Sequence, residues 1–298
     1  MFRLPAVVSV TILSNHESGE VLDMGDGSAA DINGDVAQRL DSRLKDLLGD
    51  VGQPKGKVSK KACAAAVIMA GGSGERFGNP GGKQLFRLLG KPSLTWAIQA
   101  FDEAGDVGQI VVVCPDERAE EYRREAVEPY DFVTPIVFAS AGSIRQESAM
   151  NGVCAADDKW DIIVVHDGAR PLVTVDLIDR SICMLKGDLD IDGVVVGHPS
   201  IDTLKVVDQK NIVGTPDRNM FWVAQTPQAF RSSLLRRAYT AAMYEGFVGT
   251  DDSSLVERMG GVVDMIDGPR DNFKITVPED VAPAVAALAG RIAVREGM

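Results

Sequence analysis

Short runs of Val, Ile and Ala that alternate with helix-forming segments constrain the fold of this 298-residue chain more than any other feature. From residue 62 onward the strand candidates are residues 64–70, 109–114, 135–139, 161–166 and 193–197. Other segments have apolar residues three or four apart, as amphipathic helices do, namely residues 93–103, 117–127, 145–156, 176–186, 232–245 and 280–291. Uninterrupted apolar strands joined by helices are typical of a parallel sheet that helices cover on both faces. We therefore predict an α/β fold with a mostly parallel, twisted sheet.

The N-terminal part of the chain differs in composition from the rest. Residues 23–48 pass from an Asp-, Gly- and Ser-rich loop to leucines at helical spacing, and residues 49–61 contain four lysines without apolar periodicity. We expect an N-terminal extension and linker of unknown role over residues 1–61, and one main domain over residues 62–298. Within that domain, residues 199–216 interrupt the alternation of strands and helices and are expected to form an arm.

The net charge of the chain limits the classes of partner that it can bind. Asp and Glu total 43 against 31 Lys and Arg, which gives a net charge of −12. A surface with this charge repels phosphate backbones, so we expect no binding to nucleic acid and none to an anionic membrane. Any ligand that carries phosphate must therefore be held by a local basic pocket.

Two further features concern the compartment. The four cysteines form no Cys-x-x-Cys pair and lie in or beside apolar runs, which indicates a reducing compartment, and we expect a cytoplasmic protein. The longest apolar run, residues 62–70, is far shorter than the roughly 20 residues that span a bilayer. Residues 8–12 alternate as a strand does, and the apolar residues 4–13 precede no small-residue cleavage site, which argues against a signal peptide.

A glycine-rich loop follows the first strand candidate, with AGGSGERFG at residues 70–78 and GGKQ at residues 81–84. Closely spaced glycines let backbone N–H groups approach an anion. The loop is neither a Walker A loop, since no Gly-Lys-Ser/Thr closes it, nor a dinucleotide fingerprint, since Phe77 stands where the third glycine would be. Arg76 and Lys83 place two cations on this loop, which suits a triphosphate. The alternative is a strand–turn–helix corner with cations that face solvent.

A second motif, VHDGARP at residues 165–171, ends another apolar strand candidate. Asp167 would lie at the carboxyl end of that strand, where open α/β sheets bind ligands. A carboxylate near a triphosphate loop is a natural ligand for Mg²⁺, which takes few protein oxygens and fills its shell with phosphate and water. Alternatively, Asp167 caps the turn and pairs with Arg170. We interpret His166 as a hydrogen-bonded structural residue rather than a base.

Eight motifs occur in order over residues 62–291: AGGSGERFG, GGKQ, AGSIRQES, VHDGARP, DTLK, DRNMFWVAQTPQAF, TDDSSLVE and DNFKITVPED. This set resembles the 2-C-methyl-D-erythritol 4-phosphate cytidylyltransferase family of the non-mevalonate isoprenoid pathway. The ribitol-5-phosphate cytidylyltransferases share most of these motifs, and the AGG of the loop is similar to theirs, whereas HDGARP and TDDSSLVE favour the methylerythritol family.

The resemblance implies a fold and an activity. The fold would be that of a Rossmann-like nucleotidyltransferase with a protruding β-arm. The enzyme would transfer the CMP moiety of CTP to 2-C-methyl-D-erythritol 4-phosphate, giving 4-diphosphocytidyl-2-C-methyl-D-erythritol and pyrophosphate. The alternative acceptor is ribitol 5-phosphate, which would give CDP-ribitol. The resemblance also implies a homodimer that exchanges arms.

The resemblance further implies a role for each residue that matches a family motif. The catalytic cations would be Arg76, Lys83, Arg218 and Lys274. The nucleotide would be bound by Ala70, Gly71, Gly72, Gly74, Gly142, Ser143, Ser148 and Gly168. The sugar phosphate would be bound by Arg170, Thr203, Arg218, Thr250 and Lys274. Asp167 would hold Mg²⁺.

Two rival interpretations remain at this point. A nicotinamide-dependent oxidoreductase would require the missing third glycine and an acidic contact to the ribose. A binding protein that had lost activity would be expected to lack Lys83 or Asp167, and both are present. The sequence contains no evident Ser–His–Asp or Cys–His arrangement, and cytidylyl transfer requires none, because the attacking phosphate is already ionised at neutral pH.

Overall fold

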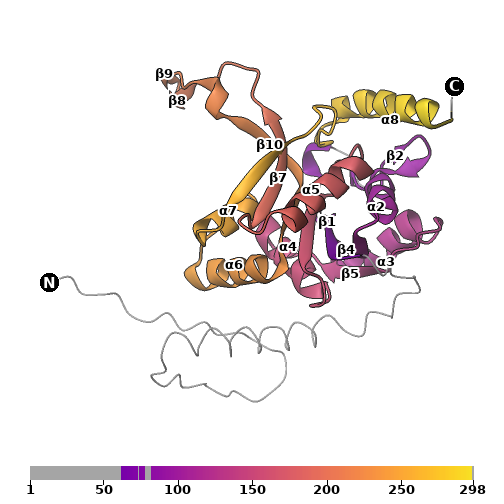
Figure 1. Ribbon diagram of the computed structural model, residues 1–298. Coiled ribbons are helices and arrows are strands. Elements are labelled where there is room, and N and C mark those ends of the chain that lie inside the picture. The colour runs from indigo at the N-terminus through magenta and orange to yellow at the C-terminus, as the bar shows by residue number, and fades with distance from the viewer. Residues whose placement is uncertain (1–61, 73, 78–81, 297–298) are drawn as a thin grey trace, which may run out of the picture. The chain divides into compact units, whose positions relative to one another are not determined.

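A seven-stranded sheet forms the centre of the computed structural model, which describes residues 62–72, 74–77 and 82–296 without the side chains of Glu75 and of residues 294–296. The predicted extension over residues 1–61 lies outside the described residues. The strand order is β11-β7-β10-β6-β1-β4-β5 (Figure 1). The strands are β1 (Ala64–Met69), β4 (Val107–Cys114), β5 (Ile136–Ser140), β6 (Ile162–Asp167), β7 (Gly193–Pro199), β10 (Trp222–Arg231) and β11 (Val263–Asp267).

The sheet is mostly parallel, as the sequence predicts. Strands β5, β4, β1 and β6 run parallel to one another, and β11 runs parallel to β7. Only β10 is antiparallel to its neighbours β6 and β7 within this sheet. The register of β1 against β6 pairs Met69 with Asp167, so the glycine-rich loop that leaves β1 begins beside Asp167.

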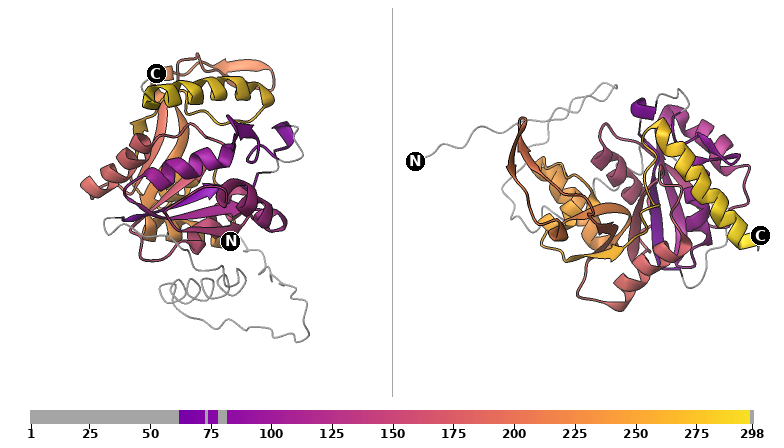
Figure 2. Two further views of the ribbon diagram at one scale, coloured as in Figure 1. Left: turned by 90° about the vertical axis from the view of Figure 1, so that its right-hand side faces the viewer. Right: turned by 90° about the horizontal axis from the view of Figure 1, so that it is seen from above.

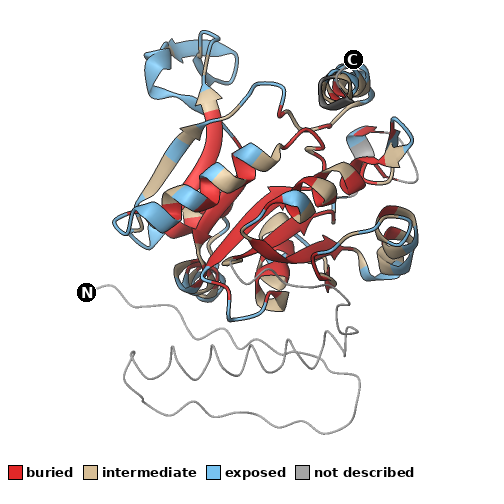
Figure 3. Ribbon diagram, turned by 45° about the vertical axis from the view of Figure 1, so that its right-hand side comes forward, coloured by how far each residue is buried: buried red, intermediate tan, exposed pale blue. Residues whose placement is uncertain are grey.

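Helices cover both faces of the sheet, and the residues of β1 alternate between the two layers. Ala64, Ala66 and Ile68 pack in one cluster with α2 and α5, whereas Ala65 and Val67 pack in a second cluster with α4, α6 and α7. The alternation arises because successive side chains of a strand point to opposite faces of the sheet. Every residue of β1 is buried (Figure 3). The α-helices are α2 (Ser93–Glu103), α3 (Ala119–Tyr122), α4 (Arg145–Ala155), α5 (Val175–Gly187), α6 (Ser232–Glu245), α7 (Asp252–Arg258) and α8 (Val281–Glu296).

All five strands and all six helices predicted from periodicity are present, with bounds shifted by a few residues and with the segment 117–127 divided into short helical pieces. Sequence periodicity missed β10, β11 and α7. Strand β10 was not predicted because three buried polar residues interrupt its apolar pattern, namely Gln225, Thr226 and Gln228. Their partners are distant in the chain, as in the bond from Gln228 Nε2 to Asp251 Oδ2 (2.9 Å).

The predicted arm forms a hairpin outside the main sheet. Strands β8 (Val206–Asp208) and β9 (Asn211–Gly214) pair in an antiparallel way and extend from the ends of β7 and β10 (Figure 1). Both strands are exposed almost throughout, including apolar residues such as Val207 and Ile212. Among the described residues, no helix combines the length and the apolar character that crossing a membrane would require.

Gly152 allows α4 to pack closely on the sheet. A Cβ at this position would overlap methyl groups of Val67 in β1 and Val113 in β4.

We expect Gly152→Ala to lower the free energy of unfolding by about 2 kcal/mol, the usual cost of overpacking a core. The control is Gly290→Ala in α8, where a Cβ meets nothing within 4 Å. That change should raise stability by roughly 0.5–1 kcal/mol through helix propensity. Urea denaturation of both variants tests the difference, and an unchanged Gly152→Ala variant would contradict it.

Candidate functional site

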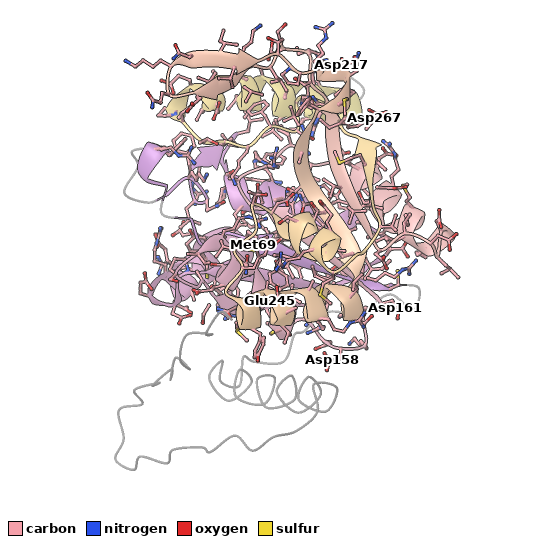
Figure 4. All side chains as sticks on the ribbon, turned by 90° about the vertical axis from the view of Figure 1, so that its left-hand side faces the viewer. Met69, Asp158, Asp161, Asp217, Glu245 and Asp267 are labelled. Atoms are coloured by element: carbon pink, nitrogen blue, oxygen red, sulfur yellow. The ribbon has the colours of Figure 1, made fainter. Side chains whose placement is uncertain are left out.

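A cavity of about 710 Å³ opens at the carboxyl ends of β1 and β6. Met69, which ends β1, lies in its wall (Figure 4). The predicted site residues that line the cavity are Gly71, Gly72, Gly74, Arg76, Lys83, Gly142, Ser143, Ser148, Asp167 and Lys274. The structure thus brings together residues that are up to 203 positions apart in the chain (Gly71 and Lys274).

The glycine-rich loop forms one wall of the cavity. The loop passes close to the segment after β5, because a Cβ on Gly71 would lie 2.7 Å from the Cβ of Ala141. Gly74 has a φ of +70°, a conformation that glycine adopts without strain, and it lies next to the backbone of Lys83. The loop therefore turns back on itself and presents both Arg76 and Lys83 to one cavity.

Lys83 is a buried cation in this wall, with 8% of its surface exposed. Burial lowers the pKa of its ammonium group, and the positive charge of Lys274 lowers it further. Both effects disfavour the charged form of Lys83. A negatively charged ligand next to Lys83 would oppose both effects and stabilise the cation.

Asp167 is buried at the end of β6, and two cations contact it. Lys274 Nζ lies 3.0 Å from Asp167 Oδ2, and Arg170 Nε lies 3.4 Å from the same oxygen. Burial alone would raise the pKa of Asp167, but the charges of Lys274 and Arg170 outweigh burial and hold it well below its usual range. Asp167 is therefore a carboxylate at neutral pH, and the predicted pairing of Asp167 with Arg170 is present in the structure.

His166 has a structural role, as the sequence analysis predicts. Its ring is fully buried, and burial lowers its pKa to about 4, so it is neutral at physiological pH. Nε2 lies 3.2 Å from the carbonyl oxygen of Arg170, which can only accept, and Nδ1 lies 2.9 Å from Thr226 Oγ1. The Thr226 hydroxyl in turn accepts from the backbone N–H of Asp167 (3.0 Å). The imidazole thus fixes the backbone on both sides of Asp167.

The segment from Gly142 to α4 forms the opposite wall, and its own hydrogen bonds hold it in place. The backbone N–H of Gly142 donates to Ser148 Oγ (2.9 Å), which donates to the carbonyl of Ile144 (3.0 Å). The N–H and hydroxyl of Ser143 both donate to Glu147 Oε2, at 2.8 and 2.6 Å. These bonds fix the shape of this wall of the cavity.

The sequence analysis did not identify Arg145, which also lines the cavity. Its guanidinium donates two bonds to Asp252 in α7, at 3.0 and 2.7 Å, and Asp252 also accepts from the buried hydroxyl of Tyr239. Gln84 and Thr276 are further lining residues that were missed. All three belong to motifs quoted above, so the available signal was their place next to predicted site residues such as Lys83.

Six predicted residues do not line this cavity. Ala70 is fully buried behind the glycines, and Gly168 donates to the carbonyl of Met69 (2.9 Å) from the strand end. Thr203, Arg218 and Thr250 are exposed. Arg218 donates to the carbonyl of Ile201 (3.0 Å) at the base of the arm, and its neighbour Asp217 lies well away from Met69 in Figure 4. Arg170 contacts the cavity indirectly, through Asp167.

Known proteins resemble this chain over most of its length. The profile of the 2-C-methyl-D-erythritol 4-phosphate cytidylyltransferase family matches residues 64–290. The enzyme of that name from Caldanaerobacter subterraneus is 41% identical over 221 residues, which cover 74% of this chain and 96% of that protein. Its counterpart from Syntrophotalea carbinolica is 41% identical over 223 residues, or 74% of this chain and 94% of that protein.

A solved structure agrees with the sequence relatives. The crystal structure of 4-diphosphocytidyl-2C-methyl-D-erythritol synthase from Anaerococcus prevotii superposes with a TM-score of 0.67 at 27% identity. It covers 77% of this chain and 97% of that one. The cavity at the carboxyl ends of β1 and β6, the order of the motifs and these relatives agree, and the chain belongs to the 2-C-methyl-D-erythritol 4-phosphate cytidylyltransferase family.

Proposed function

We propose that this chain transfers the CMP moiety of CTP to 2-C-methyl-D-erythritol 4-phosphate, releasing pyrophosphate. The observation that carries the proposal is the charge of the cavity, whose described lining contains Arg76, Lys83, Lys274 and Arg145, the last paired with Asp252, and one carboxylate, Asp167. A triphosphate and a sugar phosphate supply the negative charge that such a lining requires. Pyrophosphate release is measured with CTP and each candidate acceptor in turn. Turnover with ribitol 5-phosphate alone would support the alternative acceptor.

The proposed reaction is an in-line displacement at the α-phosphorus of CTP. An oxygen of the acceptor phosphate forms a bond to that phosphorus while the bond to the leaving pyrophosphate breaks, and pyrophosphate departs with the electron pair. The acceptor phosphate is already ionised, so no side chain has to remove a proton. Catalysis then consists of positioning and of stabilising negative charge, for which we assign Arg76 and Lys83. Lys274 would orient the acceptor phosphate from the other side of the cavity.

The nucleoside would occupy the space between the glycine-rich loop and the start of α4. Gly72 leaves room for the ribose and phosphates to approach the backbone, because a Cβ there would meet nothing within 4 Å, whereas Gly71 lets the loop approach Ala141. Gly142, Ser143 and Ser148 line the opposite wall and are assigned to the cytosine. Their mutual hydrogen bonds, described above, hold this wall in shape before CTP binds, which reduces the ordering required on binding.

The site fits a magnesium ion whose ligands would come partly from the protein and partly from the phosphates. Among residues 62–72, 74–77 and 82–296, no group of three or more His, Cys, Asp or Glu is arranged to hold a metal by protein side chains alone. Asp167 supplies one buried carboxylate beside the proposed phosphate positions, which suits the preference of Mg²⁺ for few protein oxygens. Bound there, Mg²⁺ would neutralise part of the charge of the triphosphate.

The arm supports a homodimer. It exposes a set of large apolar side chains: Ile201, Val206, Val207, Ile212, Val213, Met220, Phe221, Trp222 and Val223. A patch of this kind on an extended hairpin is typical of a subunit interface. Arg218 and Thr203 lie on the same arm, outside the cavity of their own chain, so in a dimer they would complete the site of the partner subunit. Cys63, Cys114, Cys154 and Cys183 form no disulfide in the part of the chain that the structure describes, which suits a cytoplasmic protein.

Removing either cation of the glycine-rich loop should impair chemistry more than binding. We expect Lys83→Ala and Arg76→Ala each to lower kcat by more than 100-fold, or about 3 kcal/mol, while KM for CTP changes much less. Steady-state pyrophosphate release measures both constants. Lys91→Ala is the control, since Lys91 lies outside the cavity and bonds Gln99 (2.9 Å). A normal kcat with a raised KM would show that the two cations serve only binding.

The extension should be dispensable for transfer. The family match begins at residue 64, and each cavity residue lies at or beyond Met69. A variant that starts at residue 61 is therefore expected to keep kcat and both KM values within about twofold, provided that β1 remains intact. The measurement is pyrophosphate release by the shortened and full chains side by side. A folded but inactive shortened protein would mean that the extension completes the site.

Arg218 is expected to act across subunits. Arg218→Lys should lower kcat/KM for the sugar phosphate by at least tenfold, because lysine cannot make the two parallel hydrogen bonds that a guanidinium makes to phosphate. CTP binding alone should hardly change. Mixing Arg218→Ala with Lys83→Ala subunits should restore activity, since one site of each mixed dimer then holds both intact residues. If verified mixed dimers stay inactive, Arg218 does not serve the partner's site.

A further inference from the structure

A third apolar cluster lies beside the cavity, apart from the two that pack on the sheet. We call it the α8 cluster, and its buried members are Phe77, Leu88, Leu172, Ile275, Ala284 and Leu288. Each member has at most 5% of its surface exposed. Two of them, Ala284 and Leu288, are one turn apart on α8 and therefore lie on the same face of that helix. The helix passes β2 (Arg87–Leu88), as Figures 1 and 2 show.

The members of the α8 cluster are close in sequence to cations of the proposed site. Phe77 follows Arg76, and Ile275 follows Lys274. The same relation holds for Leu172, two residues after Arg170, which contacts Asp167. Lys83 is followed in the chain by Phe86 and Leu88. Leu88 is a member of the α8 cluster, and Phe86 packs against it. Four segments that carry cations thus meet in one apolar cluster, and α8 covers it.

Polar contacts attach α8 to the same segments. Arg291 Nη1 donates to the carbonyl oxygen of Leu172 (2.6 Å), and its Nη2 bonds Asp271 (2.9 Å), three residues before Lys274. Immediately before α8, Asp280 accepts from the backbone N–H groups of Thr276 (2.6 Å) and Val277 (3.0 Å). Arg291 in α8 and Asp280 just before it are therefore bonded to the chain on either side of Lys274.

The cavity requires such support, because its cations repel one another. The charges of Lys274 and Arg76 both disfavour the charged form of Lys83, whereas those of Asp167 and Asp280 favour it. Asp167 is the one carboxylate among the described residues that line the cavity. Repulsion of this kind favours separation of the segments. Burial of Phe77, Leu172 and Ile275 in one cluster opposes that separation, since moving any of these segments outward would expose apolar surface to water.

We propose that α8 is a positioning element of the catalytic cavity, in which Leu288 and Arg291 hold the segments that carry Arg76, Lys83, Arg170 and Lys274 in the arrangement that transfer requires. The inference rests on the proposed role of these cations. Leu288 and Arg291 do not line the cavity and are positioning residues. Their effect on activity is exerted through the backbone of the segments that they contact.

A pair of matched leucine variants separates positioning from general stability. Leu288→Ala in α8 is compared with Leu235→Ala in α6, which is equally buried but packs in the cluster of α4, α6 and α7. Both variants lose a comparable amount of buried apolar surface. We expect kcat to fall at least tenfold for Leu288→Ala and less than twofold for Leu235→Ala, because small misplacements of catalytic groups are costly. KM for CTP should change less than threefold, and Leu288→Met should restore most of kcat.

A second pair avoids the hydrophobic core. Arg291→Gln removes the bonds to a backbone carbonyl and to Asp271, whereas Arg236→Gln in α6 removes bonds to the carbonyl of Ala156 (2.8 Å) and to Asp158 (3.4 Å). The two arginines are similarly exposed, at 31% and 21%. We expect kcat to fall about fivefold for Arg291→Gln and to stay unchanged for Arg236→Gln. This pair decides the question should Leu288→Ala fail to fold.

Hydrogen exchange provides a readout that does not depend on activity. The backbone N–H of Ile275 donates to the carbonyl of Ala169 (2.8 Å) and so reports whether the Lys274 segment stays in place. We expect faster exchange at Ile275 in Leu288→Ala and Arg291→Gln than in their controls. Equal exchange and equal kcat in variants and controls would overturn the inference even if Lys83→Ala is inactive. An active Lys83→Ala variant would instead refute the proposed role of the cations, while exchange would still show whether α8 holds the segments.

Discussion

Asp167 and the cations around it depend on each other for their charged states. Burial raises the pKa of the Asp167 carboxyl group and lowers that of the Lys83 ammonium group, so burial disfavours the charged form of both side chains. Asp167 has Lys274 at 3.0 Å, and removing one partner of a buried pair leaves an uncompensated charge. The cations in turn exceed what one carboxylate can balance. The cavity therefore carries an excess of positive charge that a polyphosphate can balance.

The rest of the fold serves to place these charges. The register of β1 against β6 sets the start of the glycine-rich loop beside Asp167, and the neutral ring of His166 fixes the strand end through Thr226 and the carbonyl of Arg170. Because β1 lies inside the sheet and is buried on both faces, this register cannot slip without moving apolar residues between the two helix layers. The sheet is thus a rigid support for a site built mostly from loops.

Local patterns in the sequence were enough to predict five strands of the main sheet, most helices, and the glycine-rich loop with Arg76, Lys83 and Asp167, because strand and helix periods and glycine spacing are properties of neighbouring residues. Other predicted cavity residues, such as Ser148 and Lys274, came from the resemblance to a known family rather than from local patterns. Local patterns could not reveal the contact of Arg145 with Asp252, which are 107 residues apart, or the buried polar strand β10. Nor could they show that Arg218 lies on the arm, outside the cavity of its own chain. These features depend on tertiary contacts that no short window of sequence contains.

The acidic surface and the basic cavity are compatible because they act over different distances. At physiological ionic strength the screening length is about 8 Å, so charges spread over the exterior contribute little inside a cavity lined by fixed cations. A phosphate in the cavity would lie close to the lining charges, in a medium that screens them less than water does. The net charge of −12 therefore acts mainly against extended polyanions at the surface, whereas in the proposed reaction a nucleotide inside the cavity would interact chiefly with Arg76, Lys83 and Lys274. Local arrangement rather than total charge thus determines which anions this chain can bind.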